Sequence, residues 1–474
     1  MKKLATKSPL KTSIVMIDEH LLSWNIIDIH TKIVLGPMNQ KSILTPKTIE
    51  SIKKIRNTDI LVGIPSYNNE NTIAHVLKAV RVGLTKYFPE LKSVIVNSDC
   101  GSSDDTRKVV RKNMNDYEAF NTILISHEMH PYIQNSYLPV HEMVITFRGS
   151  PGKGKAFRRI FEIGYELKAR AIVVVDSDLR SITPEWIQLL AGPILSKDFD
   201  YVAPLYSRHK YDGTITNSLV YPLTRALYGW KIRQPIGGEF GFSQKVLNHY
   251  VKEDIWGTDV GYFGIDIWMT TLALTNGFKV CQSFLGAKIH NPKNASSLAP
   301  MFKQVIGTIF SLVDENYDVW RKIKRSVDLP TFGFKAQVVP EDVFLNFDEL
   351  FHDFHKGVVK FNTIWEEILR PENHRSFEKI IHLTGESFDF PYSIWVKIIY
   401  DYLLYFQKNT KDSVEMSRSL VLESLIPIYF GFIASFVRKA KEMSSQEAET
   451  EIENVCQTFE KFKPYLIDNW NRNE

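Results

Sequence analysis

The sequence contains very little cysteine. Only Cys100, Cys281 and Cys456 occur among 474 residues, far apart and in no C-x-x-C pair. This spacing excludes a disulfide framework and a zinc site built from cysteines, and it fits a reducing compartment. We therefore expect a cytoplasmic protein.

The sequence also lacks a strong excess of charge and a long apolar run. Its 58 Lys and Arg against 54 Asp and Glu give a net charge of +4, with no dense basic block. Proteins that bind nucleic acids concentrate basic residues, so we expect no nucleic-acid partner. We see no window of about 18 apolar residues, which predicts no membrane span. The first 16 residues are charged and only briefly apolar, unlike a signal peptide.

The sequence does contain apolar runs of strand length that end in polar residues. The clearest is AIVVVDSDLR at 171–180, where an unbroken, β-branched run predicts a buried strand of a parallel sheet. Asp176 and Asp178 follow at its carboxyl end, where open α/β sheets bind ligands. A divalent cation shared with a phosphate would offset the repulsion between the two carboxylates. The alternative is an acidic turn that caps a helix at 184–190.

Strand and helix patterns alternate along most of the chain and then give way to helices. This order predicts an α/β fold with a doubly wound, mostly parallel sheet and an α-helical C-terminal region. We expect a lead-in at 1–57 with a helix starting at Thr45-Pro46, a catalytic domain at 58–330 and a helical domain at 331–474. The expected strands are 59–65, 91–97, 122–126, 171–175, 200–204 and 278–285, and the expected C-terminal helices are 341–369, 393–407, 413–441 and 446–462.

Three further polar loops are expected at the edge of the sheet that carries Asp176. Residues 65–70 (PSYNNE) follow the first strand and residues 99–102 (DCGS) follow the second. These loops could hold a nucleotide, with a carboxylate for the base or ribose, or they could be ordinary turns. The loop 152–155 (GKGK) precedes a helix, so it could bind an anion or be a solvated basic turn.

Two single residues complete the candidate site. Asp266 lies in the first turn of a helix expected at 264–275. It is either a carboxylate for a sugar or acceptor hydroxyl, or an acid favoured by the helix dipole. His290 follows the last strand, and it is either a metal ligand or an ordinary surface or core histidine.

In this order the motifs resemble those of the retaining nucleotide-sugar glycosyltransferases of the GT-A fold. The similarity is to the group of glucosyl-3-phosphoglycerate, glucosylglycerate and mannosylglycerate synthases, and it covers about 58–300. It implies a Rossmann-like, mostly parallel sheet with flanking helices. The motifs that carry it are Pro65, Asn68 and Glu70, then 99–103, 151–154, 176–178, 234–238, 264–267 and His290.

The resemblance also implies a reaction. A hexose, glucose or mannose, would move with retention from a nucleoside-diphosphate sugar of the UDP-glucose or GDP-mannose type to glycerate, a glycerate derivative or a sugar. The product would be a compatible solute such as glucosylglycerate or mannosylglycerate. Catalysis would depend on Mg²⁺ or Mn²⁺.

Roles for individual residues follow from the same resemblance. Asp178 and His290 would hold the metal, with Asp176 on the ribose or on a water of the metal. Lys153 would meet the diphosphate and Asp266 would bind sugar hydroxyls or orient the acceptor, so Lys153, Asp178 and Asp266 are the expected catalytic residues. The other donor- or acceptor-site residues implied are Pro65, Ser66, Tyr67, Asn69, Glu70, Asp99, Cys100, Ser177 and Gly238.

One position departs from the family pattern. Members that use phosphoglycerate have an arginine after Gly-Gly, and this chain has Glu239. An arginine fork fits a carboxylate or phosphate, which a glutamate would repel. This disfavours 3-phosphoglycerate and favours a polyol or sugar hydroxyl as acceptor. The C-terminal helices have no counterpart that can be aligned, and they would form a dimer interface, cover the acceptor site, or both.

Two other functions fit the same sheet. A nucleotidyltransferase that makes sugar nucleotides shares the acidic edge, but it normally carries a glycine-rich loop after the first strand, which 65–70 lacks. A non-catalytic protein could bind a sugar nucleotide and use the helical region for its main role.

Overall fold

The computed structural model describes residues 42–115, 141–146, 152–290, 295–335, 338, 340–408 and 416–470. Within them an eight-stranded sheet has the order β3-β2-β1-β4-β6-β5-β7-β8. Only β6 among these strands runs antiparallel to its neighbours, so the expected α/β class with a mostly parallel sheet is confirmed. The strands are β1 (Ile60–Ser66), β2 (Ser93–Asp99), β3 (His141–Thr146), β4 (Ala171–Val174), β5 (Tyr201–Ser207), β6 (Phe240–Ser243), β7 (Val280–Ala287) and β8 (Thr331–Phe332).

The centre of the sheet is apolar on both faces. Every residue of β1, β2 and β4 is buried, as expected for strands covered by helices on both sides. The parallel register pairs Ser66 of β1 with Asp99 of β2, and Gly63 of β1 with Val174 of β4. The loops that follow these strands therefore leave the sheet at the same edge.

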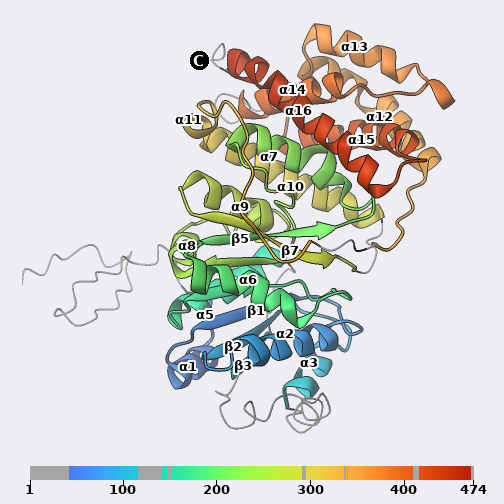
Figure 1. Ribbon diagram of the computed structural model, residues 1–474. Coiled ribbons are helices and arrows are strands. Elements are labelled where there is room, and N and C mark those ends of the chain that lie inside the picture. The colour runs from blue at the N-terminus through green and yellow to red at the C-terminus, as the bar shows by residue number, and fades with distance from the viewer. Residues whose placement is uncertain are drawn as a thin grey trace, which may run out of the picture.

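Helices cover both faces of the sheet (Figure 1). One apolar cluster joins the sheet to α2 (Ile73–Tyr87), α3 (Thr106–Asn115) and α6 (Pro184–Lys197). A larger cluster joins the other face to a second set of helices and continues into the C-terminal helices. This second set is α1 (Pro46–Ile55), α5 (Lys153–Glu166), α7 (Tyr221–Tyr228), α8 (Gln244–Tyr250) and α9 (Ile265–Thr275).

The C-terminal helices stack beyond α7 and α9, at the top of Figure 1. Because their apolar side chains belong to the same cluster as the sheet, the helices and the sheet share one core. The boundaries at 57/58 and 330/331 stay predictions. The C-terminal helices are α12 (Phe347–Ile368), α13 (Pro371–Ile381), α14 (Tyr392–Lys408), α15 (Arg418–Lys439) and α16 (Ser445–Trp470), whereas α10 (Ala295–Glu315) and α11 (Tyr317–Trp320) precede them and lie beside α7 and α9 in Figure 1.

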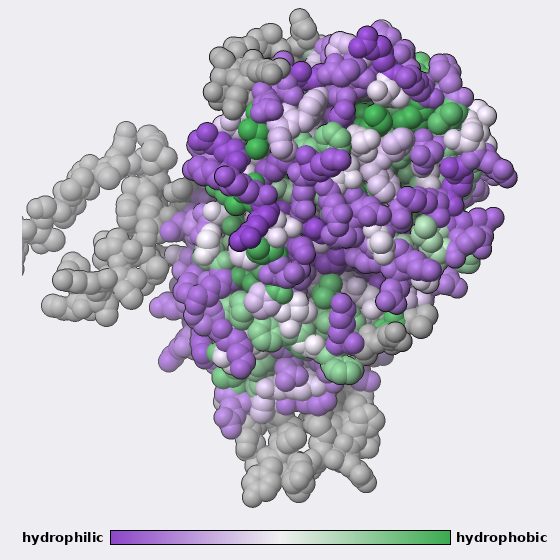
Figure 2. All heavy atoms as spheres, turned by 45° about the horizontal axis from the view of Figure 1, so that its top comes forward, coloured by the Kyte–Doolittle hydropathy of each residue, from purple (hydrophilic) through white to green (hydrophobic). Residues whose placement is uncertain are grey.

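Helix α15 is long and apolar enough to cross a membrane, which corrects the expectation that no such window exists. However, 83% of that window is buried inside the protein. Figure 2 shows a mainly hydrophilic surface on the visible face, with hydrophobic residues in small patches. These features are typical of a core helix.

Most local expectations hold, with informative differences. Thr45 caps α1 by accepting from the Thr48 amide, and Pro46 opens the helix. The strand expected at 122–126 lies outside the described residues, and β3 is the third strand described. Helix α6 begins after Thr183, so Asp176 and Asp178 do not cap it and the capping alternative is wrong.

Candidate active site

A cavity of about 950 Å³ opens at the carboxyl edge of the sheet. The loops after β1, β2, β4, β5 and β7 surround it, together with α10 and the segment 340–345. The predicted residues that line it are Pro65, Ser66, Tyr67, Asn69, Cys100, Lys153, Asp176, Ser177, Asp178, Asp266 and His290.

Lys153 lies at the centre of a chain of charges on the cavity wall. Its Nζ is 2.9 Å from Asp176 Oδ1 and 2.9 Å from Asp266 Oδ2. Although burial disfavours the ammonium, the two carboxylates raise the pKa of Lys153 above its ordinary value. The other Asp266 oxygen, Oδ1, is buried and has no hydrogen-bond partner in the structure. It is a ready acceptor for a ligand hydroxyl, because an unpaired buried acceptor is costly.

The chain of charges continues to Lys288, which no sequence motif singles out. Lys288 Nζ lies 3.2 Å from Asp176 Oδ2, 2.9 Å from both carboxylate oxygens of Glu239 and 2.7 Å from the Gly237 carbonyl. Burial opposes its charge, but Glu239 and Asp176 raise the pKa of Lys288. The available signal was its position, since Lys288 directly follows β7 at the same sheet edge as Asp176.

Glu239 is part of this network and does not face the cavity. Its side chain is 0% exposed, accepts from Lys288 and from the Tyr206 hydroxyl, and does not line the cavity. Burial raises the pKa of Glu239 to about 7. The expectation that Glu239 repels an anionic acceptor is therefore wrong, because its carboxyl group is buried, bonded to Lys288 and out of reach of the cavity.

Gly238 and the loop 152–155 also differ from what was expected. Gly238 does not line the cavity; it has φ +94°, and a Cβ there would lie 2.2 Å from Asp176 Oδ2. The glycine therefore makes room for the ion pairs. A Cβ on Gly154 would lie 1.8 Å from the Val260 carbonyl, so close packing against 260–262 requires this glycine.

The two loops on the nucleotide side hold each other. Asn69 Oδ1 accepts from the Tyr67 amide and the Ser177 hydroxyl, at 3.0 and 2.7 Å. Asp99 is fully buried and accepts from the amides of 101 and 102, both at 3.0 Å. The Glu70 carboxylate accepts from the Asp105 amide at 2.8 Å. Asp99 and Glu70 therefore shape the loops without lining the cavity.

Cys100 lies where the two loops meet the glycine-lysine loop. Its Sγ donates to the Gly152 carbonyl at 3.3 Å, and its amide donates to the Ser66 carbonyl at 2.8 Å. Burial raises the pKa of the Cys100 thiol, so the thiol acts as a small packing group beside the cavity rather than as a nucleophile.

Asp178 and His290 line the same cavity from segments that run side by side. A backbone bridge pairs Leu179 with His290, and both predicted metal ligands line the cavity. Across the described residues, no three His, Cys, Asp or Glu side chains group closely enough to hold a metal by themselves. A carboxylate and an imidazole still fit a Mg²⁺ or Mn²⁺ that takes its other ligands from water and a diphosphate. Asp176 fits this role less well, because both of its oxygens face ammonium groups.

Comparisons with known proteins support the resemblance found in the sequence. No family model matches the chain. The chain is 25% identical over 282 residues to the glucosyl-3-phosphoglycerate synthase of Mycolicibacterium paratuberculosis, covering 56% of this chain and 75% of the relative. It is 25% identical over 268 residues to the synthase of the same name from Petrotoga mobilis, covering 54% and 73%. The expected similarity to this group of enzymes is thus confirmed at the level of sequence.

Solved structures give a weaker likeness. The Mycobacterium tuberculosis glucosyl-3-phosphoglycerate synthase with phosphoglyceric acid matches with a TM-score of 0.40 and 21% identity, over 58% of this chain and 85% of that one. The same enzyme with Mn²⁺, uridine-diphosphate-glucose and phosphoglyceric acid gives a TM-score of 0.39 and 21% identity, over 58% and 85%.

Proposed function

We propose that this chain, a relative of the glucosyl-3-phosphoglycerate synthases, is a metal-dependent glycosyltransferase. It moves a hexose from a nucleoside-diphosphate sugar to a small hydroxylated acceptor. The observation that carries the proposal is a single cavity lined by both nucleotide-side loops, by Lys153 between Asp176 and Asp266, and by Asp178 and His290.

The loops at the sheet edge and the names of the relatives indicate which sugar nucleotide is the donor. Residues 65–69 and Cys100 bind the base and ribose beside β1 and β2, and Tyr67 is half exposed, which suits stacking on a base. The relatives are named for glucosyl transfer, so the first donor to test is UDP-glucose. GDP-mannose has no support among them.

Charge stabilisation at the leaving group is the main catalytic task. When bound, a Mg²⁺ or Mn²⁺ held by Asp178 and His290 supplies positive charge next to the diphosphate oxygens. Lys153 adds its ammonium at the same wall, where negative charge develops as the glycosyl bond breaks. Asp266 Oδ1, which has no partner in the structure, accepts a hydrogen bond from a hydroxyl of the sugar or the acceptor. We propose retention of configuration, as the resemblance implies, by front-side attack: the acceptor oxygen bonds to the anomeric carbon as the bond to the diphosphate breaks, and the leaving diphosphate takes the acceptor proton. This route requires no nucleophile from the protein.

The direct test is an activity screen. The protein is incubated with UDP-glucose, Mn²⁺ and glycerate, 3-phosphoglycerate or glucose, and UDP release and product mass are measured. We expect UDP release that needs both metal and acceptor. Release of pyrophosphate from a nucleoside triphosphate and a sugar phosphate would instead identify a nucleotidyltransferase. A rise in melting temperature with UDP-glucose but no turnover would identify a binding protein.

A variant tests the metal site separately from turnover. Asp178→Asn is expected to abolish the additional thermal stabilisation that Mn²⁺ gives in the presence of UDP. The matched control is Asp318→Asn, which changes an exposed acid outside the cavity. Equal stabilisation of wild type and Asp178→Asn would contradict the assigned ligand. A cytoplasmic location and a homodimer stay predictions.

A further inference from the structure

The register of β5 and β7 brings another cation to the cavity. Ser207 at the end of β5 pairs with Ala287 at the end of β7, so the next residues, Arg208 and Lys288, leave the sheet side by side. In the strand order, β1 and β2 lie on one side of β4, whereas β5 and β7 lie on the other. Arg208 therefore lines the part of the cavity opposite the proposed nucleotide loops.

Arg208 has more unused hydrogen-bond donors than Lys153 or Lys288, the two lysines that also line this cavity. Lys153 and Lys288 each contact two carboxylates. Within the described residues, the ion pair and hydrogen bond that Arg208 makes are both with Asp212, at 3.1 Å from Nη1. Its side chain is 12% exposed and its Nε is buried without a partner. A guanidinium has five N–H donors, so most of them are available.

The Tyr206 ring and Gly213 surround the Arg208 guanidinium at the cavity wall. The guanidinium stacks over the Tyr206 ring with 5.3 Å between Cζ and the ring centroid. Gly213 has φ +68°, and a Cβ there would lie 3.2 Å from Arg208 Nη1. The glycine thus leaves space beside the guanidinium.

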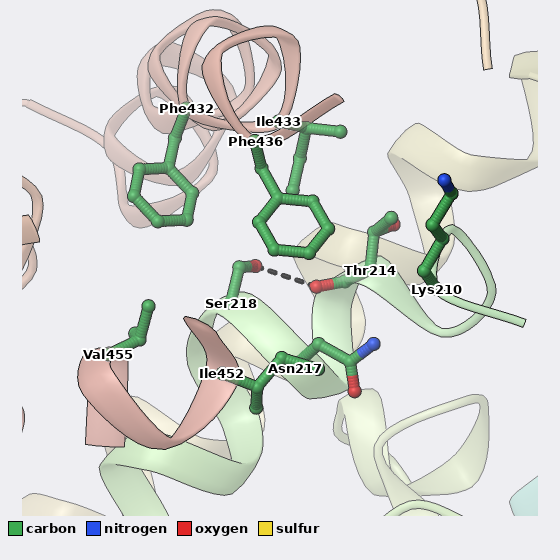
Figure 3. Close-up of a pocket in the computed structure, with 9 residues that line it drawn as sticks. All are labelled: Lys210, Thr214, Asn217, Ser218, Phe432, Ile433, Phe436, Ile452 and Val455. Carbon is green, nitrogen blue, oxygen red and sulfur yellow. Dashed lines mark hydrogen bonds between the residues drawn. The ribbon is translucent and has the colours of Figure 1, made fainter. Parts of the chain in front are cut away.

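The segment that carries Arg208 is fastened to the C-terminal helices. Lys210 Nζ donates to the carbonyls of Ala440, Lys441 and Met443 at 2.6–2.8 Å, just beyond the end of α15. Ala440 is the C-cap of α15, and a cation at this end of a helix interacts favourably with the helix dipole. Lys210 and Thr214 line a small void of about 10 Å³ together with side chains of α15, and Figure 3 shows these lining residues. Thr214 also bonds the Tyr429 hydroxyl at 2.6 Å.

Resting on the function proposed above, we propose that Arg208 binds an oxyanion of the acceptor, a carboxylate or a phosphate. Lys210 is a positioning residue that holds Arg208 through the end of α15. A planar guanidinium fork matches both oxyanions. The C-terminal helical region therefore completes the acceptor side of the site, and the acceptor is an acidic polyol rather than a neutral one.

The first experiment varies the acceptor charge with Arg208→Met. Glycerate offers only a carboxylate, glycerol 3-phosphate only a phosphate, and glycerol neither. We expect the KM of the preferred anion to rise about 10-fold or more, with the UDP-glucose KM unchanged and the preference over glycerol lost. Arg208→Lys should recover part of the preference, because it keeps the charge but not the fork. An unchanged ratio of anion to glycerol, or an equal rise in both KM values, overturns the proposal.

Direct binding separates this proposal from the proposed function. Glycerate and glycerol 3-phosphate are titrated calorimetrically into wild type and Arg208→Met with UDP and Mn²⁺ present. We expect one of the anions to bind wild type and to bind the variant at least about 10-fold more weakly. Equal binding, or no binding of either anion to wild type, overturns the role of Arg208 even if transfer occurs. Binding without any transfer overturns the proposed function alone.

The role of Lys210 is tested by a second set of variants. Lys210→Met should raise the KM of the anionic acceptor about 3-fold or more and leave the donor KM unchanged, and Lys210→Arg should restore it. The control is Lys441→Met, which changes an exposed lysine at the same helix end. A lower melting temperature without a change in acceptor KM shows a purely structural role and overturns the positioning role.

Discussion

Substitution of Glu239 by Gln should change how the stability of the protein depends on pH. Glu239 is fully buried, and burial raises its pKa from 4.5 to about 7. The folded state therefore holds a proton that the unfolded state releases between these pH values. The contribution of Glu239 to stability is complete below pH 4.5 and is lost as the pH rises through about 7. Glutamine has the same shape and does not titrate.

The size of the effect follows from the two pKa values. Each pH unit between them is worth about 1.4 kcal/mol, which gives about 3 kcal/mol in total. The free energy of unfolding of wild type relative to Glu239→Gln should therefore fall by about 3 kcal/mol between pH 4.5 and pH 7.5. Acidic groups distant from Glu239 titrate alike in both proteins, so their effects cancel in the difference.

Urea unfolding followed by tryptophan fluorescence at several pH values measures this difference. Glu90→Gln is the control, because it removes an exposed glutamate and should give no such trend. If the difference between wild type and Glu239→Gln stays constant with pH, the buried network does not hold Glu239 as described. A difference of opposite sign would mean that Lys288 stabilises the carboxylate more than burial destabilises it.

Other substitutions test the remaining parts of the site. Gly238→Ala should reduce transfer at least about 100-fold, because its Cβ would collide with Asp176. The control Gly257→Ala has open space around its Cβ and should leave transfer unchanged. Normal activity of Gly238→Ala would refute the packing argument. Lys153→Met should lower kcat by about 100-fold with little change in acceptor KM, as measured by steady-state kinetics. An unchanged kcat with a raised acceptor KM would contradict the role of Lys153 at the leaving group. Arg225→Leu breaks ion pairs with α16 and should cost about 3 kcal/mol in urea unfolding, so an unchanged midpoint would contradict it.

Much of the fold could be predicted because its signals are local. The apolar runs of β1, β2 and β4 and the Thr45-Pro46 helix start are read directly from neighbouring residues. Strand β6 was not expected, because four residues interrupted by a glycine have no clear period. Helix α16 continues past 462 to Trp470, although Pro464 lies inside it, since packing against α7 and α14 outweighs the local preference.

The candidate site divides in the same way. Asp178, Lys153 and His290 could be selected because each lies at the end of a strand or the start of a helix. The pairing of Lys288 with Glu239 spans 49 residues and depends on the antiparallel insertion of β6. The resemblance places Glu239 toward the acceptor, whereas in the structure its carboxylate is buried beside Lys288. Arg208 gave no signal, because its importance depends on how many carboxylates each of the neighbouring cations contacts in the folded protein.

The bonds from Lys210 to the end of α15 join parts of the chain about 230 residues apart. One rim of the cavity thus depends on a part of the chain that is distant in sequence. Under the proposed acceptor role of Arg208, substitutions in the C-terminal helices would change the choice of acceptor while the sheet and its acidic edge stay the same. The acceptor could in this way change without any substitution at the reaction centre in the α/β domain.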